Sequence, residues 1–128
     1  MENNQVTASI SKIDYQVNIN AQNHDIIADE PFEKGGGNTG FTPYDLLLAA
    51  LGACTSVTLK MYVRRKEWPI ENISVNLSLE AENGSTTITR NLIFEEGVPE
   101  EQQKKLIEIA DACPVHKILI GTINIITQ

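Results

Sequence analysis

The chain contains two cysteines, Cys54 and Cys113, whose surroundings in the sequence could support thiol chemistry. Cys54 lies inside a long apolar stretch with a helical pattern, residues 42–66. Cys113 opens the segment CPVH, residues 113–116, where one helical pattern gives way to another. Amides and the dipole at a helix start favour a thiolate, whereas burial inside a helix raises the pKa of a thiol. If the fold brings the two thiols together, they are a plausible redox pair.

The charged and polar groups that could activate these thiols are few. His116 lies one turn after Cys113 and could pair with its thiolate, or it could be a solvated helix residue. Arg64 and Arg65 lie about 15 Å further along the helix than Cys54, by the helical rise. They therefore cannot activate Cys54 within one subunit. Both cysteines could also be unrelated, buried small hydrophobes.

A metal site is an alternative to the redox pair, because four side chains could form a Cys2His2 set: Cys54, Cys113, His116 and His24. Only the C-x-x-H fragment at residues 113–116 has ligand-like spacing, which is weak evidence alone. Neither histidine lies near a nucleophile-elbow sequence of the kind found in hydrolases. We therefore expect no metal.

The glycine-rich segment EKGGGNTG, residues 33–40, is the best candidate for mobile or ligand-facing backbone. A phosphate-binding loop is disfavoured, because no strand-loop-lysine pattern follows it. We therefore expect no cofactor.

The composition restricts the class of protein. At 128 residues the chain is long enough for one domain, residues 1–128, with its own core. A net charge of −7 argues against binding to nucleic acid, which needs a basic surface. The start of the chain lacks a signal-peptide pattern, and the longest apolar run, residues 46–51, is too short to span a membrane. We expect a cytoplasmic protein, in a compartment where thiols stay reduced unless they cycle catalytically.

Hydrophobic periodicity and turn residues predict an α+β domain. Strands are expected at residues 5–10, 13–20, 24–28, 71–80, 85–94 and 122–127. Asn83-Gly84 is a strong hairpin signal between the fourth and fifth of these. Helices are expected at residues 42–66, 98–112 and 114–120, the last of them ended by Gly121.

The long helix begins with a clear start signal and predicts a partner. Thr42 is its cap, Pro43 takes the first helical position, and Asp45 can complete a capping box. Residues 46–57 are apolar or small on nearly every side, so this helix must be covered all round. A chain of this size has little material left to cover it. We therefore predict an obligate homodimer through this helix.

Two segments resemble the signature of the OsmC/Ohr family of thiol peroxidases: TPYDLLLAALGACT, residues 42–55, and CPVHK, residues 113–117. The glycine-rich loop, and ADEP at residues 28–31, also resemble the OsmC-like branch. The resemblance covers nearly the whole chain in element order. It implies an α+β fold with antiparallel sheets packed around long central helices in an intertwined homodimer.

The resemblance also implies roles for the two cysteines. Cys54 matches the peroxidatic cysteine, which a hydroperoxide oxidises to a sulfenic acid. Cys113 matches the resolving cysteine, which then forms a disulfide that a cellular dithiol reduces.

The chain departs from the family where the first cysteine is activated. The hydroperoxide reductases use an arginine in the N-terminal segment, held by a glutamate ten residues before the first cysteine. Here no arginine precedes Arg64, and Tyr44 stands at the glutamate position. Asp45 follows it, but on an ideal helix Asp45 and Cys54 face opposite ways, so only a partner subunit or a broken helix start would bring them together. His24 is a candidate polar replacement for the arginine.

Two functions follow from these observations. The first is a thiol-dependent redox protein that reduces small or organic hydroperoxides, with a dithiol as its reductant. The second is a non-catalytic protein on the same scaffold, in which the loop at residues 35–40 and the dimer groove hold an apolar small molecule. The missing arginine favours the second function, and the retention of both thiols favours the first.

Overall fold

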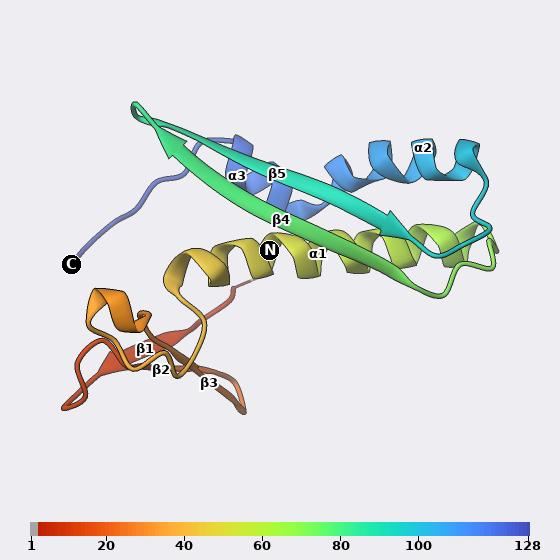
Figure 1. The fold of residues 1–128 in the computed structure, drawn as a ribbon. Coiled ribbons are helices and arrows are strands. Elements are labelled where there is room, and N and C mark those ends of the chain that lie inside the picture. The colour runs from red at the N-terminus through yellow and green to blue at the C-terminus, as the bar shows by residue number, and fades with distance from the viewer. Residues whose placement is uncertain (1–2) are drawn as a thin grey trace. The chain divides into compact units, whose positions relative to one another are not determined.

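The protein is described by a computed structural model that covers residues 3–128 (Figure 1). It is an α+β fold with two antiparallel sheets, as the sequence predicts. The chain divides into two compact units, residues 1–47 and residues 48–128. The elements in chain order are β1 (Thr7–Ile10), β2 (Val17–Ala21), β3 (His24–Ala28), η1 (Phe32–Lys34), α1 (Pro43–Arg65), β4 (Ile73–Glu82), β5 (Ser85–Phe94), α2 (Glu100–Ile109), η2 (Ala110–Ala112) and α3 (Pro114–Ile120).

The first unit contains a three-stranded antiparallel sheet in the order β1-β2-β3. Its second strand begins at Val17, later than the predicted residue 13. Tyr15 has a left-handed backbone with φ 67°, and the amide of Gln16 donates to the carbonyl of Ile13. A turn therefore occupies the residues that alternation alone assigned to the strand.

The glycine-rich loop of this unit folds around the buried carboxylate of Asp29, which is 1% exposed. Asp29 accepts hydrogen bonds from the Thr39 hydroxyl at 2.6 Å and from the amides of Glu30 and Thr39 at 2.7 and 3.2 Å. A Cβ on Gly36 would collide with the carbonyl of Glu30, so glycine is required there. Backbone amides of this segment that could have bound a ligand thus donate hydrogen bonds to a side chain of the same unit.

The second unit contains a long hairpin of β4 and β5, with Ile73 opposite Phe94 and Glu82 opposite Ser85. Its turn is formed by Asn83 and Gly84, both with positive φ, as the sequence predicts. Side chains along β4 alternate between partly buried and exposed. One face of the hairpin therefore packs on the helices.

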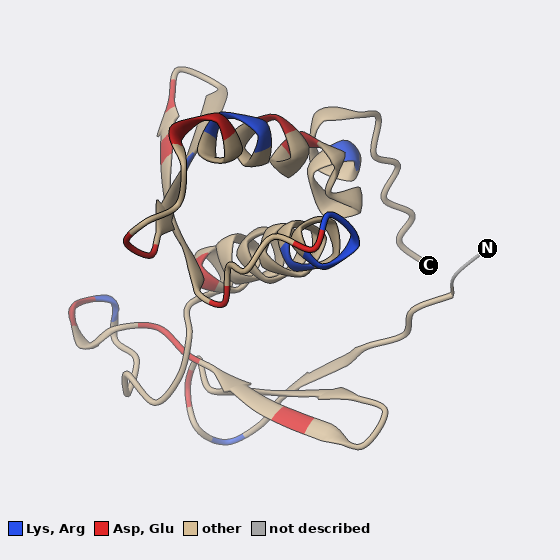
Figure 2. Cartoon of the chain, turned by 90° about the vertical axis from the view of Figure 1, so that its right-hand side faces the viewer, with Lys and Arg blue, Asp and Glu red and all other residues tan. Residues whose placement is uncertain are grey.

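The core of the second unit joins α1 to the segment α2-η2. Leu59, Tyr62 and Val63 of α1 pack with Ile70 and with two residues of the other segment, Leu106 and Ala110. Partly buried residues of the hairpin close over this cluster, among them Ile73, Leu92 and Phe94. In the view along α1, the hairpin lies beside α1 and α2 (Figure 2). This packing fixes the residues that follow Ala110 against the middle of α1.

Helix α1 begins as its sequence predicts. The amide of Asp45 donates to the Thr42 hydroxyl at 3.1 Å, and the amide of Thr42 donates to the Asp45 carboxylate at 3.3 Å. This reciprocal pair is a capping box. The helix is uncharged over most of its length, and basic residues follow at its C-terminal end (Figure 2).

Length and composition alone would allow α1 to cross a membrane, with a mean hydropathy of 1.6 over an 18-residue window, 28% of which is buried. The contiguous apolar run that the sequence shows is much shorter. Small residues interrupt this apolar run but lower the mean hydropathy of the 18-residue window only slightly. Central helices of soluble proteins meet the same criterion, so this finding alone does not indicate a membrane span.

The predicted strand at residues 122–127 is wrong. Helix α3 ends at Ile120, and the residues that follow form no strand with any part of residues 3–128. Ile123, Ile125 and Ile126 are 52%, 88% and 84% exposed. The alternating sequence is suited to a strand, but a strand needs a neighbour to hydrogen-bond, and this segment has none among the described residues.

Candidate active site

The structure brings the two cysteines together. Cys54 lies in the middle of α1, and Cys113 lies between η2 and α3. Both are free thiols, and they lie near enough for each to shift the pKa of the other. Cys113 is completely buried, whereas Cys54 is partly exposed. The pairing that the sequence suggested is therefore present within a single chain.

Local sequence explains how Cys113 reaches α1. Pro114 takes the first position of α3, which obliges Cys113 to adopt an extended backbone, φ −58° and ψ 127°. Three residues earlier, Ala110 is buried in the core against α1. The chain therefore turns immediately after a fixed point and directs the Cys113 thiol at the helix.

Burial raises the pKa of the Cys54 thiol above its ordinary value, and the hydrogen bond with Cys113 raises it further. The amide of Val115 and the hydroxyl of Thr58 act in the opposite direction but do not cancel these effects. This agrees with the expectation that a thiol in the middle of this helix resists ionisation.

Cys113 behaves differently although it is the more buried of the two. Burial alone would raise its pKa, but hydrogen bonds from the Cys54 thiol, from the amides of His116 and Val115, and from the Thr55 hydroxyl outweigh burial and hold the pKa below its ordinary value. When the pair loses one proton, the negative charge therefore resides mainly on Cys113, and the Cys54 thiol donates to it. The loss of this proton belongs to the pair rather than to one residue.

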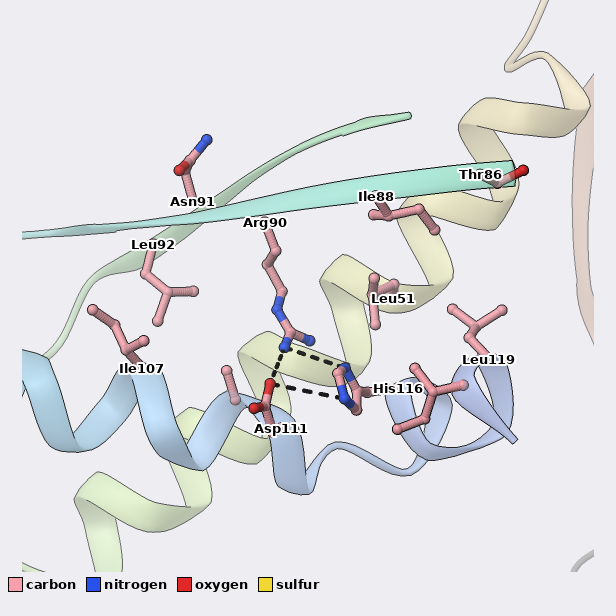
Figure 3. A pocket seen from close by; sticks show the side chains of 12 residues that line it. Leu51, Thr86, Ile88, Arg90, Asn91, Leu92, Ile107, Asp111, His116 and Leu119 are labelled. Carbon is pink, nitrogen blue, oxygen red and sulfur yellow. Dashed lines mark hydrogen bonds and ion pairs between the residues drawn. The ribbon is translucent and has the colours of Figure 1, made fainter. Parts of the chain in front are cut away.

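An arginine that we did not single out from the sequence lies next to this pair. Arg90 of β5 has a side chain that is 12% exposed. Its Nη1 donates to the Thr55 hydroxyl at 3.1 Å. Its Nη2 donates to Asp111 Oδ1 at 2.8 Å (Figure 3). Thr55 follows Cys54 in α1, and its hydroxyl lies near enough to Cys113 to lower the pKa of that thiol. A guanidinium is thus linked to the cysteine pair through one hydroxyl.

The sequence does contain a signal for Arg90. It alternates with Ile88 and Leu92 along β5, so all three share the face that packs on the helices. A cation on the apolar face of a strand needs buried partners, because an unpaired buried charge is costly.

The His116 side chain lies against Arg90 and Asp111, and its pairing with the Cys113 thiolate stays a prediction. Its imidazole Nδ1 lies 3.3 Å from Arg90 Nη2, and its Nε2 lies 3.8 Å from Asp111 Oδ1 (Figure 3). Arginine has no acceptor, so Nδ1 accepts and the ring proton is on Nε2, facing Asp111. His116 interacts with Cys113 through its backbone amide instead.

The two remaining candidates, Asp45 and His24, lie in the first unit. The Asp45 carboxylate accepts the hydrogen bond of the capping box, and its side chain is exposed. His24 is exposed at the start of β3, opposite Ala21. A catalytic role for either residue stays a prediction. Within residues 3–128, no three His, Cys, Asp or Glu side chains converge as metal ligands.

A cavity of about 620 Å³ adjoins the Arg90 network. Its polar lining residues are Thr86, Arg90, Asn91, Asp111 and His116 (Figure 3). The rest of its lining is mostly aliphatic and comes from α1, β5, α2 and α3: Leu51, Ile88, Leu92, Ile107, Leu119 and Ile120. Its lining residues include neither cysteine.

Comparisons with known proteins agree with this fold. Residues 35–128 match the family described as OsmC-like protein. An OsmC-like protein from Mycoplasma pneumoniae is similar in structure with a TM-score of 0.80 and 21% identity, covering 94% of this chain and 89% of that one. OhrB of Bacillus subtilis, an organic hydroperoxide resistance protein, gives 0.67 and 23% over 94% and 92%. An organic hydroperoxide resistance protein OsmC from Legionella pneumophila gives 0.68 and 17% over 94% and 91%.

A search of curated proteins gave no match. The family match covers well over half of the chain and includes both cysteines and the helices that hold them. This chain therefore belongs to the OsmC family.

Proposed function

We propose that the protein is a thiol-dependent hydroperoxide reductase in which Cys54 and Cys113 form the redox pair. The observation that carries this proposal is the proximity of two free thiols within one chain, each of which shifts the pKa of the other. The structural relatives from Bacillus subtilis and Legionella pneumophila, both named as organic hydroperoxide resistance proteins, support hydroperoxides as the substrate class.

Exposure and charge suggest different roles for the two cysteines. Cys54 is partly exposed, so it is the sulfur that an incoming hydroperoxide can reach. The pKa of Cys113 lies below its ordinary value and that of Cys54 above it, so Cys113 is the thiol that ionises first. Transfer of the Cys54 proton to Cys113 would leave the negative charge on Cys54. Cys113 would thus act as the base that activates Cys54, without a proton acceptor from solvent.

The reaction then proceeds in two steps. The Cys54 thiolate attacks the terminal oxygen of the hydroperoxide, the O–O bond breaks, and the departing alkoxide takes a proton from water to give an alcohol. Cys54 is now a sulfenic acid. The Cys113 sulfur attacks the Cys54 sulfur, a disulfide forms, and the hydroxyl group leaves with the Cys113 proton as water. A dithiol then reduces the disulfide and restores both thiols.

We also propose that the protein is a soluble, cytoplasmic homodimer that associates through α1. Only six residues of this helix are buried, and none of them precedes Leu51. Val57 and Met61 are 58% and 68% exposed although both are apolar. Size measurement at low micromolar concentration tests the association. A stable, folded monomer would contradict it.

Steady-state turnover tests the proposed activity. The purified protein should consume an organic hydroperoxide continuously when a dithiol is supplied, and Cys54→Ser should lose this turnover completely. Ser56→Ala is a matched control on the same helix, because its hydroxyl donates to the Gly52 carbonyl and not to a thiol. If Cys54→Ser kept the activity of the wild type, the role assigned to Cys54 would be wrong.

The cavity beside Arg90 favours a second candidate function, the binding of an apolar small molecule. Its volume lies in the range of ligand-binding pockets, and its lining combines aliphatic walls with a few polar groups. This function becomes the better conclusion if wild type leaves alkyl and hydrogen peroxides unreduced and its thiols unchanged. Binding of an apolar fluorescent probe, weakened by Leu119→Arg, would then support it.

A further inference from the structure

Arg90 is nearly buried, and only one of its three partners, Asp111, is an acidic side chain. A guanidinium taken out of water is costly unless its donors are hydrogen-bonded. Asp111 neutralises its charge from a position that is 68% exposed. The other two partners, Thr55 and His116, are neutral. One end of the guanidinium thus forms an ion pair near solvent, while Nη1 is directed inward at a threonine hydroxyl.

The Thr55 hydroxyl is completely buried and has one proton to donate. In the structure this proton goes to the Leu51 carbonyl at 2.7 Å, while the oxygen accepts from Arg90 at 3.1 Å. Cys113 is a second acceptor within reach of the same hydroxyl. Arg90 donates to the oxygen of this hydroxyl, so the hydroxyl proton can be donated either to the Leu51 carbonyl or to the Cys113 sulfur. A charged donor on that oxygen also makes the hydroxyl a stronger donor.

We propose that Arg90 is a positioning residue of the cysteine pair, which acts through Thr55 to direct a hydroxyl proton at the Cys113 sulfur when that sulfur is charged. This inference rests on the proposed function, because it explains how the pair keeps a thiolate ready in a buried site. Arg90 comes from β5, on the C-terminal side of both α1 and Cys54. It therefore supplies a cation to the pair by a route that does not use the N-terminal segment.

The groups that face Cys113 come from every element packed against it. They are the Cys54 thiol from α1, the Thr55 hydroxyl from α1, and the amides of Val115 and His116 from α3. Arg90, Asp111 and the His116 imidazole form the next layer. A structural alternative is that Arg90 only ties β5 to η2 through its ion pair with Asp111. The two roles can be separated, because one depends on Nη1 and the other on Nη2.

The experiment is a pH titration of thiolate ultraviolet absorbance, which needs neither a hydroperoxide nor access of a reagent to the buried sulfur. It is performed on Cys54→Ser, so that Cys113 is the only thiol. Into this background we introduce Arg90→Met, Arg90→Lys, Thr55→Val and Asp111→Asn, with Arg64→Met as a control for an exposed arginine of α1. Circular dichroism establishes that each variant is folded.

Arg90→Met and Thr55→Val should each raise the midpoint of the Cys113 titration by about one pH unit, which is a tenfold loss of thiolate below the midpoint. Arg90→Lys should recover part of the shift, and Asp111→Asn and Arg64→Met should not raise the midpoint. An unchanged midpoint in a folded Arg90→Met overturns the proposal. An increase in Asp111→Asn as large as in Arg90→Met also overturns it, because the ion pair would then be the cause. If Arg90→Met does not fold, Thr55→Val decides: an unchanged midpoint there is contrary to the proposal.

These outcomes are independent of peroxidase activity. A protein that reduces no hydroperoxide could still show the midpoint shifts, and an active protein could lack them. Failure of this inference and failure of the proposed function are therefore distinguishable.

Discussion

Two buried acidic groups, Asp29 in the first unit and Cys113 in the second, are surrounded by the same kinds of donor. Asp29 accepts from backbone amides and from the Thr39 hydroxyl. Cys113 interacts with backbone amides and with the Thr55 hydroxyl. Burial opposes ionisation at both groups, yet both have a pKa below the ordinary value because the donors outweigh burial.

The difference lies in what else the donors do. The Thr39 hydroxyl donates to Asp29, and the carboxylate has no neighbouring acid with which to share a proton. The Thr55 hydroxyl donates to the Leu51 carbonyl, and Cys113 lies near a second thiol, Cys54, with which it can exchange a proton. Asp29 thus fixes a loop in one arrangement, whereas Cys113 belongs to a pair that can move a proton. We therefore infer that similar donors stabilise a structural carboxylate in the first unit and a reactive thiolate in the second.

Removal of the Cys113 sulfur should have the largest effect on the reaction. Cys113→Ser should abolish continuous turnover, because Cys54 would lose its base and its resolving partner. We expect it to consume at most about one equivalent of hydroperoxide per chain and then to stop. Single-turnover assays with excess hydroperoxide measure this stoichiometry. Continuous turnover by Cys113→Ser would show that the pair is not the catalytic unit.

Replacing the threonine beside Cys113 and the threonine beside Asp29 should have different effects on the reaction. Thr55→Val should slow hydroperoxide reduction at neutral pH by about tenfold, because the thiolate loses a donor and its pKa rises by about one unit. Thr39→Val should leave this rate unchanged but lower the thermal unfolding temperature, because Asp29 loses the donor that most lowers its pKa. Stopped-flow kinetics and calorimetry on the two variants test both statements. A slower reaction in Thr39→Val would remove the distinction between a structural and a reactive anion.

The pH dependence of the reaction follows from the direction of the two thiol shifts. The rate should rise with pH as Cys113 ionises, with a midpoint below 9.0, the ordinary value for a thiol. A second change, from ionisation of Cys54, should occur above 9.0 because burial raises its pKa. Pseudo-first-order rates measured across this range test the order. A single midpoint at or above the ordinary value would contradict the assignment of the thiolate to Cys113.

The smallest expected effect is on stability in acid. The pKa of Asp29 is lower in the folded protein than in the unfolded chain, so its contribution to stability is present above the unfolded pKa of about 3.9. This contribution is lost as the pH falls through the lower, folded pKa. Asp29→Asn should be less stable than wild type at neutral pH, and this difference should shrink in acid. Urea titrations at several pH values measure the difference. A difference that stays constant with pH would show that the charge of Asp29 does not stabilise the fold.

The features that were predicted correctly from sequence are those encoded by neighbouring residues. The capping box of Thr42 and Asp45 and the Asn83-Gly84 turn each depend on a few consecutive positions. The strand predicted at residues 122–127 failed because a strand depends on a distant neighbour. Arg90 was missed for a related reason. Its partners, Thr55, Asp111 and His116, come from three other elements, and only the packing of β5 brings them together.

The residues alone made the two cysteines a plausible redox pair if the fold joined them, and the resemblance to the family implied that it does. The burial of Ala110 and Leu106 against α1 accounts for it in physical terms. The helix start at Cys113 indicated which thiol would favour the charge, but not how its pKa stays below the ordinary value despite complete burial. That depends on donors from α1 and α3, and on Arg90 behind Thr55, whose geometry only the folded chain provides.

We propose that the two thiols react together with a hydroperoxide. The number of free thiols per chain, measured before and after the reaction, tests this proposal. The reduced protein is treated with one equivalent of an organic hydroperoxide per chain, denatured, and titrated for free thiol. The account predicts a fall from two thiols per chain to none, with recovery of both after addition of a dithiol. Two thiols per chain remaining after exposure to the hydroperoxide would contradict it.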